Sequence, residues 1–240
     1  MSLSDDLVAW WSPSLTYVSS DADCLVDLSG NGYDGTYNGG MGTVANTESG
    51  GTRAFLFDGS NDYLSVAHAA GFAFGTGPFS ISYWIKHTTL GGNQWAIDKG
   101  FATGNATRFI TGISSNTSDT YMFWANGYLG SGFFNRTSWV HYLVSRTGTT
   151  VSIYTDGVFR ASGTYANSLT NTDQLVIGAR SDGALAYTFG LIDQVAIWSA
   201  DKSAFVSDLY NGGRGYDWRS GSAAAVNAQQ NNHPSRSQAL

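Results

Sequence analysis

Alternating apolar and polar positions run through most of this chain and predict β-strands rather than helices. The clearest stretch covers residues 138–165, where two alternating runs meet at Thr147-Gly148-Thr149 and a second turn follows at Asp156-Gly157. Glycine and aspartate at such points are typical of tight hairpin turns. The stretch therefore predicts a β-meander.

Further strands are expected along the rest of the chain. In residues 78–86 the apolar side chains of Phe79, Ile81, Tyr83 and Ile85 fall on one face, which predicts a central strand. Shorter candidate strands cover residues 7–11, 54–57, 63–66, 94–99, 108–113, 120–126, 127–134, 174–179 and 191–198. Residues 21–40 are rich in turn-forming Gly, Asn and Asp and predict loops.

One helix is expected, over residues 202–210. Asp201 can cap its start, Phe205 and Leu209 lie four residues apart on one face, and Gly212-Gly213 ends it. One short helix beside so many strands indicates an all-β domain.

The composition changes after Gly215, where Ala, Ser, Asn and Gln replace the periodic apolar pattern. We therefore expect one domain over residues 1–215 and an extended Ala/Asn/Gln-rich arm over residues 216–240. Two interpretations of the arm stay open: a disordered terminus, or a segment that orders against a partner through the anchoring aromatics Tyr216 and Trp218.

Four segments together resemble a known family. They are FDGSNDYLSV (57–66), PFSISYWIK (78–86), the meander at 138–165 and GLIDQVAIWSADKSAFVSDLYNGG (190–213). In this order they closely resemble the concanavalin A-like jelly rolls of the laminin G type. The resemblance covers residues 5–215 and implies a two-sheet antiparallel jelly-roll β-sandwich. That fold carries lectins, adhesion modules, capsid parts and glycosidases, so it does not define the function by itself.

The amino-acid composition limits the classes of partner that this chain can bind. Charged residues make up 12% of the chain and aromatic residues 14%, which predicts a neutral, aromatic surface. A net charge of −6 with three lysines argues against nucleic acid as a partner. The acidic N-terminus does not resemble a secretion signal, and no apolar run approaches the ~18 residues of a membrane span. We therefore expect a chain made in the cytosol without a signal peptide and without membrane insertion.

The titratable residues argue against catalysis. Relatives of this fold that cleave glucans use two closely spaced carboxylates, normally Glu. This chain has a single glutamate, Glu48, and most of its Asp residues stand in turn contexts such as Asp34-Gly35. The His residues show no metal-ligand spacing and no adjoining nucleophile motif. We therefore predict that the protein is not an enzyme.

The resemblance also implies a possible metal. Many concanavalin A-like domains hold Ca²⁺ with Asp and Asn oxygens, and the positions that best match the shared motifs are Asp27 and Asp193, with Asn31 as an added ligand. The alternative is that Asp27 forms a hydrogen-bonded turn and that Asp193 accepts bonds from loop amides.

Aromatic residues in or beside Gly/Asn-rich segments are candidate ligand contacts, because loops and edges can expose ring faces to sugars or proteins. They are Trp95, Trp124, Tyr128, Phe133, Phe134 and Tyr187. Arg180, at the start of an expected exposed loop, joins Trp95, Trp124, Tyr128 and Tyr187 as a predicted ligand-binding residue. The alternative for each ring is ordinary core packing.

These observations leave three function classes. The first hypothesis is a non-catalytic virion structural or adhesion protein, because the chain resembles such proteins of tailed phages. It would form a homo-oligomer on the virion surface, as a capsid decoration or a tail-associated protein, and bind a capsid or tail protein or a cell-surface glycan. The alternatives are a carbohydrate-binding lectin module and a glycoside hydrolase. Convergence of exposed aromatics with Asn, Asp and Arg in one concave site would favour the lectin.

Overall fold

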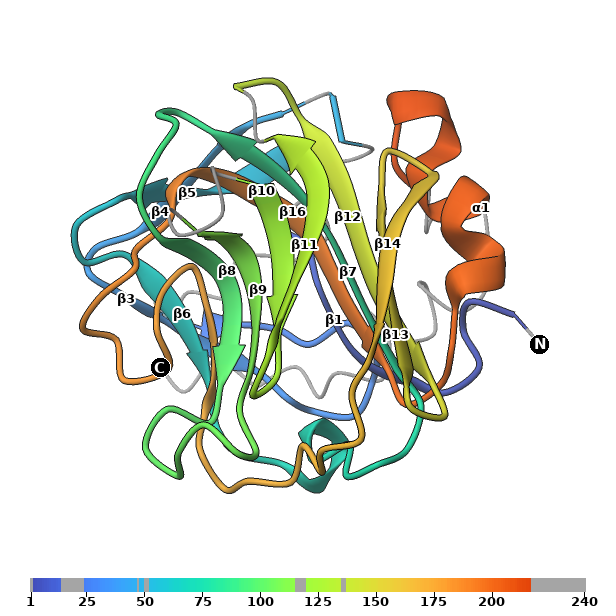
Figure 1. Cartoon of the computed structure of the whole chain (residues 1–240). Helices are drawn as coiled ribbons and strands as arrows, with labels where there is room; N and C mark the ends of the chain where they lie inside the picture. Colours follow the sequence, from blue (N-terminus) through green and yellow to red (C-terminus); the bar gives the residue numbers. More distant parts are fainter. Residues whose placement is uncertain are drawn as a thin grey trace.

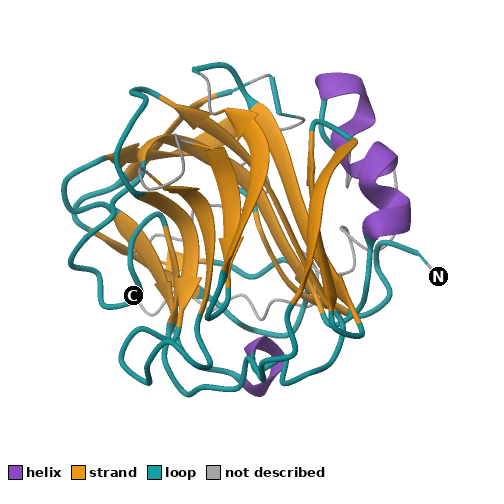
Figure 2. Ribbon diagram, in the orientation of Figure 1, coloured by secondary structure: helices purple, strands orange, loops and turns teal. Residues whose placement is uncertain are grey.

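The structure, a computed structural model, describes residues 2–13, 24–46, 48–49, 52–114, 120–134 and 137–216. Two antiparallel sheets lie face to face and form a β-sandwich (Figures 1 and 2). The predicted fold class is therefore confirmed.

Sheet A has eight strands in the described part of the chain. Its order is β14-β13-β12-β7-β16-β5-β4, and β1 also pairs with β16. The bounds are β1 (Leu7–Trp11), β4 (Gly42–Ala45), β5 (Arg53–Asp58), β7 (Phe79–His87), β12 (Val140–Thr147), β13 (Thr150–Thr155), β14 (Val158–Thr164) and β16 (Phe189–Trp198).

Sheet B also has eight described strands, in the order β11-β10-β9-β8-β15-β6-β3-β2. The bounds are β2 (Cys24–Leu25), β3 (Gly35–Asn38), β6 (Tyr63–Val66), β8 (Gln94–Lys99), β9 (Phe109–Ser114), β10 (Thr120–Trp124), β11 (Tyr128–Phe134) and β15 (Leu175–Ile177). Strands β8 to β11 follow one another in space as they do in sequence, and in Figure 1 they lie in front of β7, β12 and β16.

The predicted meander is formed by β12, β13 and β14. Thr147 pairs with Thr150, so Gly148 and Thr149 make a two-residue turn. Asp156 and Gly157 both have positive φ, 52° and 77°, which is the backbone that a tight hairpin turn with the twist of its strands requires. Local turn chemistry thus defines the register of this part of sheet A.

The core lies between the two sheets. Phe57, Phe79 and Ile192 from sheet A meet Phe109 and Tyr121 from sheet B, and all five side chains are fully buried. The apolar faces predicted from period-two alternation therefore pack against each other, which supplies the main stabilisation of such a sandwich.

The structure differs from the sequence prediction at β3 and β4. Their residues lie in or next to the region predicted as loops, yet β3 pairs with β6 in sheet B and β4 pairs with β5 in sheet A. Gly39 and Gly40, with φ of 80° and 86°, turn the chain between them. Both strands are short and partly exposed, so pairing with a longer neighbour, rather than their own pattern, makes them strands.

The C-terminal helical segment begins as the 3-10 turn η3 (Ser203–Phe205), continues as α1 (Val206–Tyr210) and ends as η4 (Asn211–Gly213). The Asp201 carboxylate accepts a hydrogen bond from the Ser203 N–H at 2.8 Å. Another short 3-10 turn, η1 (Ala70–Phe72), places Phe72 in the core.

Candidate ligand-binding groove

Strands β8 to β10 present an apolar and aromatic outer face as well as a core face. On β10, Tyr121 and Phe123 belong to the core, and the alternate residues Met122 and Trp124 face away from it. On β9, Ile110 likewise lies opposite the core residue Phe109. The outer face of sheet B is therefore not the polar surface that a half-buried strand usually shows.

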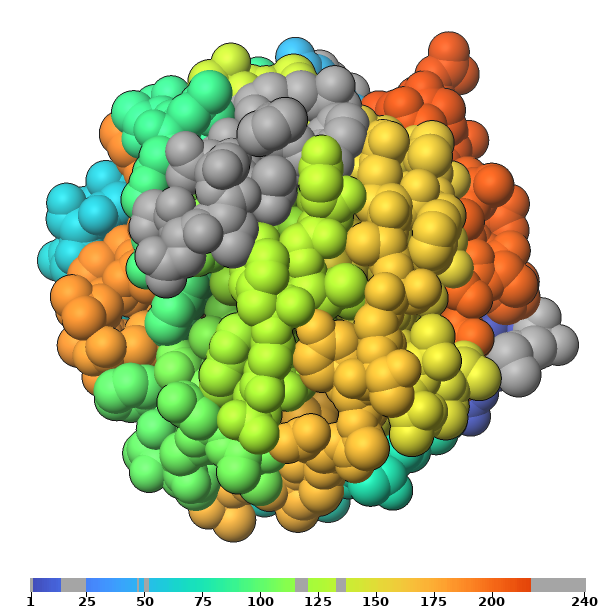
Figure 3. Space-filling view, viewed as in Figure 1, coloured from blue at the N-terminus to red at the C-terminus, as the bar shows by residue number. Residues whose placement is uncertain are grey.

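This outer face holds a groove with a volume of about 520 Å³, which lies within the range of ligand sites, roughly 300–1,000 Å³. Its described lining combines aromatic, aliphatic, amide and hydroxyl side chains with one arginine: Asn93, Trp95, Asn105, Arg108, Ile110, Ser114, Met122, Trp124 and Tyr128. The green to yellow-green atoms of β8 to β11 lie on the face of the molecule shown in Figure 3.

A β-bulge places Trp95 in this groove. Ala96 is an extra residue in β8, because Trp95 pairs with Gly112 while Ile97 pairs with the next residue of β9, Thr111. Ala96 and Ile97 both enter the core, so Trp95 before them and Asp98 after them lie on the outer face. Gly112 has a φ of 148°, and a Cβ there would lie 2.4 Å from the Gln94 carbonyl oxygen, so the bulge requires glycine.

Arg108 is held at one side of the groove by a buried carboxylate. Its Nε and Nη2 donate to the two Asp98 oxygens at 2.8 and 2.6 Å, and the Ser181 N–H donates to the same carboxylate at 2.7 Å. The guanidinium carbon lies 4.7 Å from the centre of the Trp95 ring and 4.9 Å from that of Phe101. Burial raises the pKa of the Asp98 carboxyl, although the bonds from Arg108 oppose this rise. The pair therefore neutralises the charge of Arg108 and fixes its guanidinium group at the side of the groove.

Tyr128, at the start of β11, is the most exposed ring of the groove, with 40% of its surface accessible. It lies over Gly130, where a Cβ would come within 2.8 Å of the Tyr128 hydroxyl oxygen. Asn126 turns the chain just before it with a φ of 52°. A tight turn and a missing side chain therefore allow the ring to lie along its own strand.

Three of the predicted ligand-binding residues, Trp95, Trp124 and Tyr128, come together in this groove. Arg180 and Tyr187 are not among its lining residues. The Arg180 guanidinium carbon lies 4.0 Å from the centre of the Phe101 ring, on the edge next to the groove, and the Tyr187 hydroxyl donates to the Gly183 carbonyl at 2.6 Å. The side chains of Phe133 and Phe134 lie outside the described part.

Sequence reasoning missed Arg108, and also Asn93, Asn105, Ile110, Ser114 and Met122. A signal for Arg108 was present: Asp98 and Arg108 both fall within the candidate strands 94–99 and 108–113, and charges buried in a sheet are normally paired. Met122 and Ile110 gave no such signal, because an apolar residue in a strand is expected in the core.

The residues predicted to hold calcium lie in two hydrogen-bond clusters, one around Asp27 and Asn31 and one around Asp193. The Asp27 oxygens accept from the Trp10 and Ser29 N–H groups at 3.0 and 2.9 Å, from the Ser29 hydroxyl at 2.7 Å and from the Tyr33 N–H at 3.1 Å. The Asn31 amide donates to the Val8 carbonyl at 2.9 Å.

Asp193 is fully buried on β16. It accepts from the Ser12 and Ser49 hydroxyls at 3.0 and 2.8 Å, from the Asn46 amide at 3.3 Å and from the Gln194 N–H at 2.7 Å. Burial raises its pKa to about 6 against these bonds. No group of three or more His, Cys, Asp or Glu residues that could hold a metal ion is found in the part of the chain that the structure describes. Calcium binding stays a prediction, and it is tested below.

The predicted partner anchors fall at the end of the described chain. Tyr216 is partly buried and packs against a cluster that includes Trp10, Trp198 and Leu209. Trp218 and the rest of the arm lie outside the described residues. Within the described residues, no helix is long and apolar enough to span a bilayer.

Comparison with known families agrees with this architecture. The family model described as the concanavalin A-like lectin/glucanases superfamily matches residues 58–204, which is more than half of the chain. The protein therefore belongs to this superfamily. No curated protein was found to match it.

Several solved structures share the fold. Domain 4 of AbnA, a GH43 extracellular arabinanase from Geobacillus stearothermophilus solved in complex with arabinotriose, is 19% identical with a TM-score of 0.64, over 85% of this chain and 97% of that domain. The binding domain of Paraclostridial Mosquitocidal Protein 1 is 16% identical with a TM-score of 0.67, over 88% and 53% of the two chains.

The binding domain of botulinum neurotoxin DC, solved in complex with rat synaptotagmin II, is 14% identical with a TM-score of 0.64, over 88% and 52% of the two chains. This chain thus spans about half the length of the two toxin binding domains. At these identities the likeness establishes the fold alone.

Proposed function

We propose that this protein is a non-catalytic glycan-binding module that takes a sugar chain in the groove of β8 to β11. The observation that carries the proposal is the convergence of Trp95, Trp124 and Tyr128 in one groove with amide groups and an arginine. Sugar rings have apolar C–H faces and polar hydroxyl edges, so a site for them combines flat aromatic surfaces with a few fixed hydrogen-bonding groups.

The groove chemistry does not favour the hydrolase alternative. Its described lining includes no Asp or Glu, whereas glycosidases need two carboxyl groups about 5–10 Å apart at the scissile bond. The carboxylate of Asp98, next to the groove, is fully buried and bonded to Arg108, so neither of its oxygens is available to a sugar.

The comparisons support a binding role by likeness of fold. The arabinanase domain was solved with arabinotriose, and the neurotoxin binding domain with synaptotagmin II or with SialylT. A location on a virion surface and assembly into a homo-oligomer stay part of the proposal. Proteomics of purified particles and native mass measurement of the isolated protein test them.

The binding proposal is tested by removing one exposed ring at a time. Tyr128→Ala takes away a ring that is 40% exposed, and Phe159→Ala removes a matched ring that is 52% exposed on β14 of the other sheet. After a glycan array identifies ligands, calorimetry should show that Tyr128→Ala weakens binding by about 1–2 kcal/mol, roughly 5–30-fold. Phe159→Ala should leave the affinity unchanged.

Equal losses in the two variants, or no ligand on an array of plant, bacterial and animal glycans, would count against the groove. Melting curves of both variants separate lost contact from lost fold, because exposed rings contribute little to stability.

A further inference from the structure

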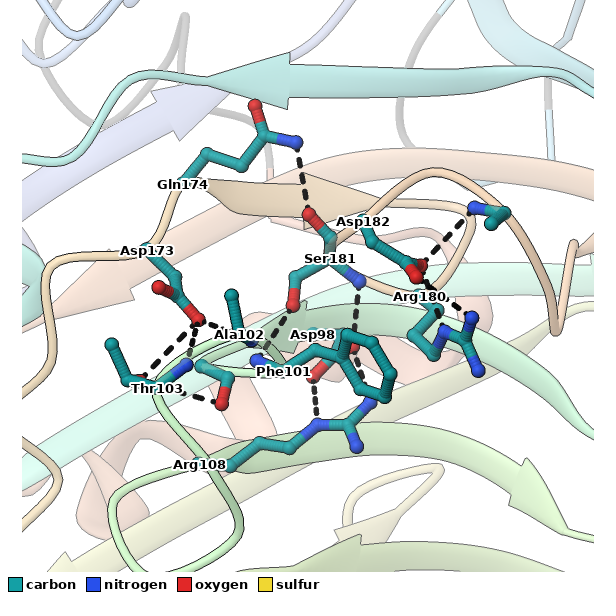
Figure 4. Close-up of polar contacts among 12 residues, drawn as sticks. Asp98, Phe101, Ala102, Thr103, Arg108, Asp173, Gln174, Arg180, Ser181 and Asp182 are labelled. Carbon is teal, nitrogen blue, oxygen red and sulfur yellow. Dashed lines mark hydrogen bonds and ion pairs between the residues drawn. The ribbon is translucent and has the colours of Figure 1, made fainter.

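The charged groups beside the groove form a stacked ladder. The guanidinium groups of Arg108 and Arg180 lie over the Phe101 ring at 4.9 and 4.0 Å, and Arg108 also lies over Trp95 at 4.7 Å. The order is therefore Trp95, Arg108, Phe101, Arg180, with aromatic rings and cations alternating. Figure 4 shows the part of it from Arg108 to Arg180.

Each cation of the ladder has its own carboxylate. Asp98 holds Arg108 through two bonds at 2.8 and 2.6 Å. Asp182 holds Arg180 through two bonds, both at 2.7 Å (Figure 4). A two-point pair of this kind neutralises the charge and fixes the guanidinium plane. Both arginines therefore contribute flat stacking surfaces with no net charge.

The remaining described amide and hydroxyl side chains of the groove are uncharged: Asn93, Asn105, Ser114 and Tyr128. An acidic sugar would thus meet no unbalanced cation among the described residues. It would meet only paired charges there, on a protein that carries a net charge of −6. Like charges brought together at a binding site cost affinity.

We propose that the groove selects uncharged glycans and discriminates against those that carry carboxylates, sialylated or uronate-containing chains included. This inference rests on the proposed function, because it assigns the ligand class of the same groove. Selection follows from aromatic stacking and neutral hydrogen bonds, because the described residues of the groove offer no unpaired cation to an acidic ligand.

The test compares each acidic glycan with the same chain after methyl esterification or carboxyl reduction, so that only the charge differs. Calorimetry of the full chain should show at least about tenfold tighter binding of the neutral form. Between 50 and 500 mM NaCl the affinity for the neutral form should change less than twofold, since salt screens only charged pairs. Tyr128→Ala should weaken this binding.

A second experiment removes the carboxylate that pairs with Arg180. Asp182→Asn removes the partner carboxylate at a partly exposed position, and Asp208→Asn is the matched control, because it removes one acid from the exposed surface of α1. Asp182→Asn should raise the affinity for the acidic form about threefold or more relative to that for the neutral form. Asp208→Asn should change neither, since it lies on the helix beside sheet A.

The outcomes separate the two proposals. Two results overturn the selection for uncharged glycans but not the glycan-binding groove. One is equal binding of both forms. The other is tighter, salt-sensitive binding of the acidic form, provided that Tyr128→Ala abolishes it. Binding that is unaffected by Tyr128→Ala, or absent for every pair, overturns the groove itself.

Discussion

Breaking the buried Asp98–Arg108 pair should destabilise the fold more than any exposed ion pair does. Asp98 is fully buried and Arg108 is 5% exposed, so Asp98→Ala leaves a guanidinium charge in a place that water barely reaches. An uncompensated charge of this kind costs about 3–5 kcal/mol. For a chain of this size, that corresponds to a fall in melting temperature of roughly 6–20 °C.

Arg108→Ala should cost less than Asp98→Ala. Asp98 then takes up a proton more easily, because burial already raises its pKa, and the neutral acid tolerates the site. The double variant removes both charges, so its loss should be smaller than the sum of the single losses by about 2 kcal/mol.

Urea unfolding of the wild type, both single variants and the double variant at pH 7 measures this coupling. The exposed pair of Lys86 and Glu48, which lie 3.3 Å apart, gives the matched control cycle and should show a coupling below about 1 kcal/mol. If the losses at Asp98 and Arg108 add to within about 0.5 kcal/mol, the pair is not the coupled unit described above.

Three further predictions follow from other parts of the molecule. Burial raises the pKa of Asp193 to about 6, so its stabilising contribution relative to Asp193→Asn is greatest below pH 3.8 and falls by roughly 3 kcal/mol as the pH rises through 6. Urea unfolding of both proteins from pH 4 to 7 measures this change. A difference in stability that does not vary with pH contradicts the prediction. If Asp27, Asn31 and Asp193 hold Ca²⁺, excess chelator should lower the melting temperature, whereas an unchanged curve leaves the hydrogen-bonded clusters as their role. Deleting residues 221–240 should leave the melting temperature nearly unchanged while abolishing oligomerisation, and normal assembly of the truncated chain would refute the arm hypothesis.

The sequence predicts the sandwich well because the information for it is local. Period-two alternation identifies β7, and turn residues such as Asp156-Gly157 define hairpins, so each strand carries evidence of its own. Strand β3 was missed because its conformation depends on pairing with β6, 25 to 31 residues further along the chain, and β4 was missed because it depends on pairing with β5. Pairing with a partner strand leaves little trace in the residues of a short strand.

The groove could be predicted in part, for the same reason. Trp95, Trp124 and Tyr128 stood out because rings beside Gly and Asn in strands and turns are candidates for exposure. Arg108 did not, because its place depends on the ion pair with Asp98, ten residues earlier on the neighbouring strand. The bulge at Ala96, which decides which way Trp95 points, is visible only in the pairing of β8 with β9.

The groove is thus formed by local features of the strand backbone more than by loops. Trp95 is positioned by an extra residue in β8 and by Gly112 opposite it, and Tyr128 is positioned by Gly130 beneath its ring. A site of this kind loses little conformational freedom when a ligand binds, because its rings are already held by the sheet and Trp95 also stacks on Arg108. In the glycan-binding role proposed above, each ring of such a groove would contribute modestly to affinity, at a position that the strands of the sheet define.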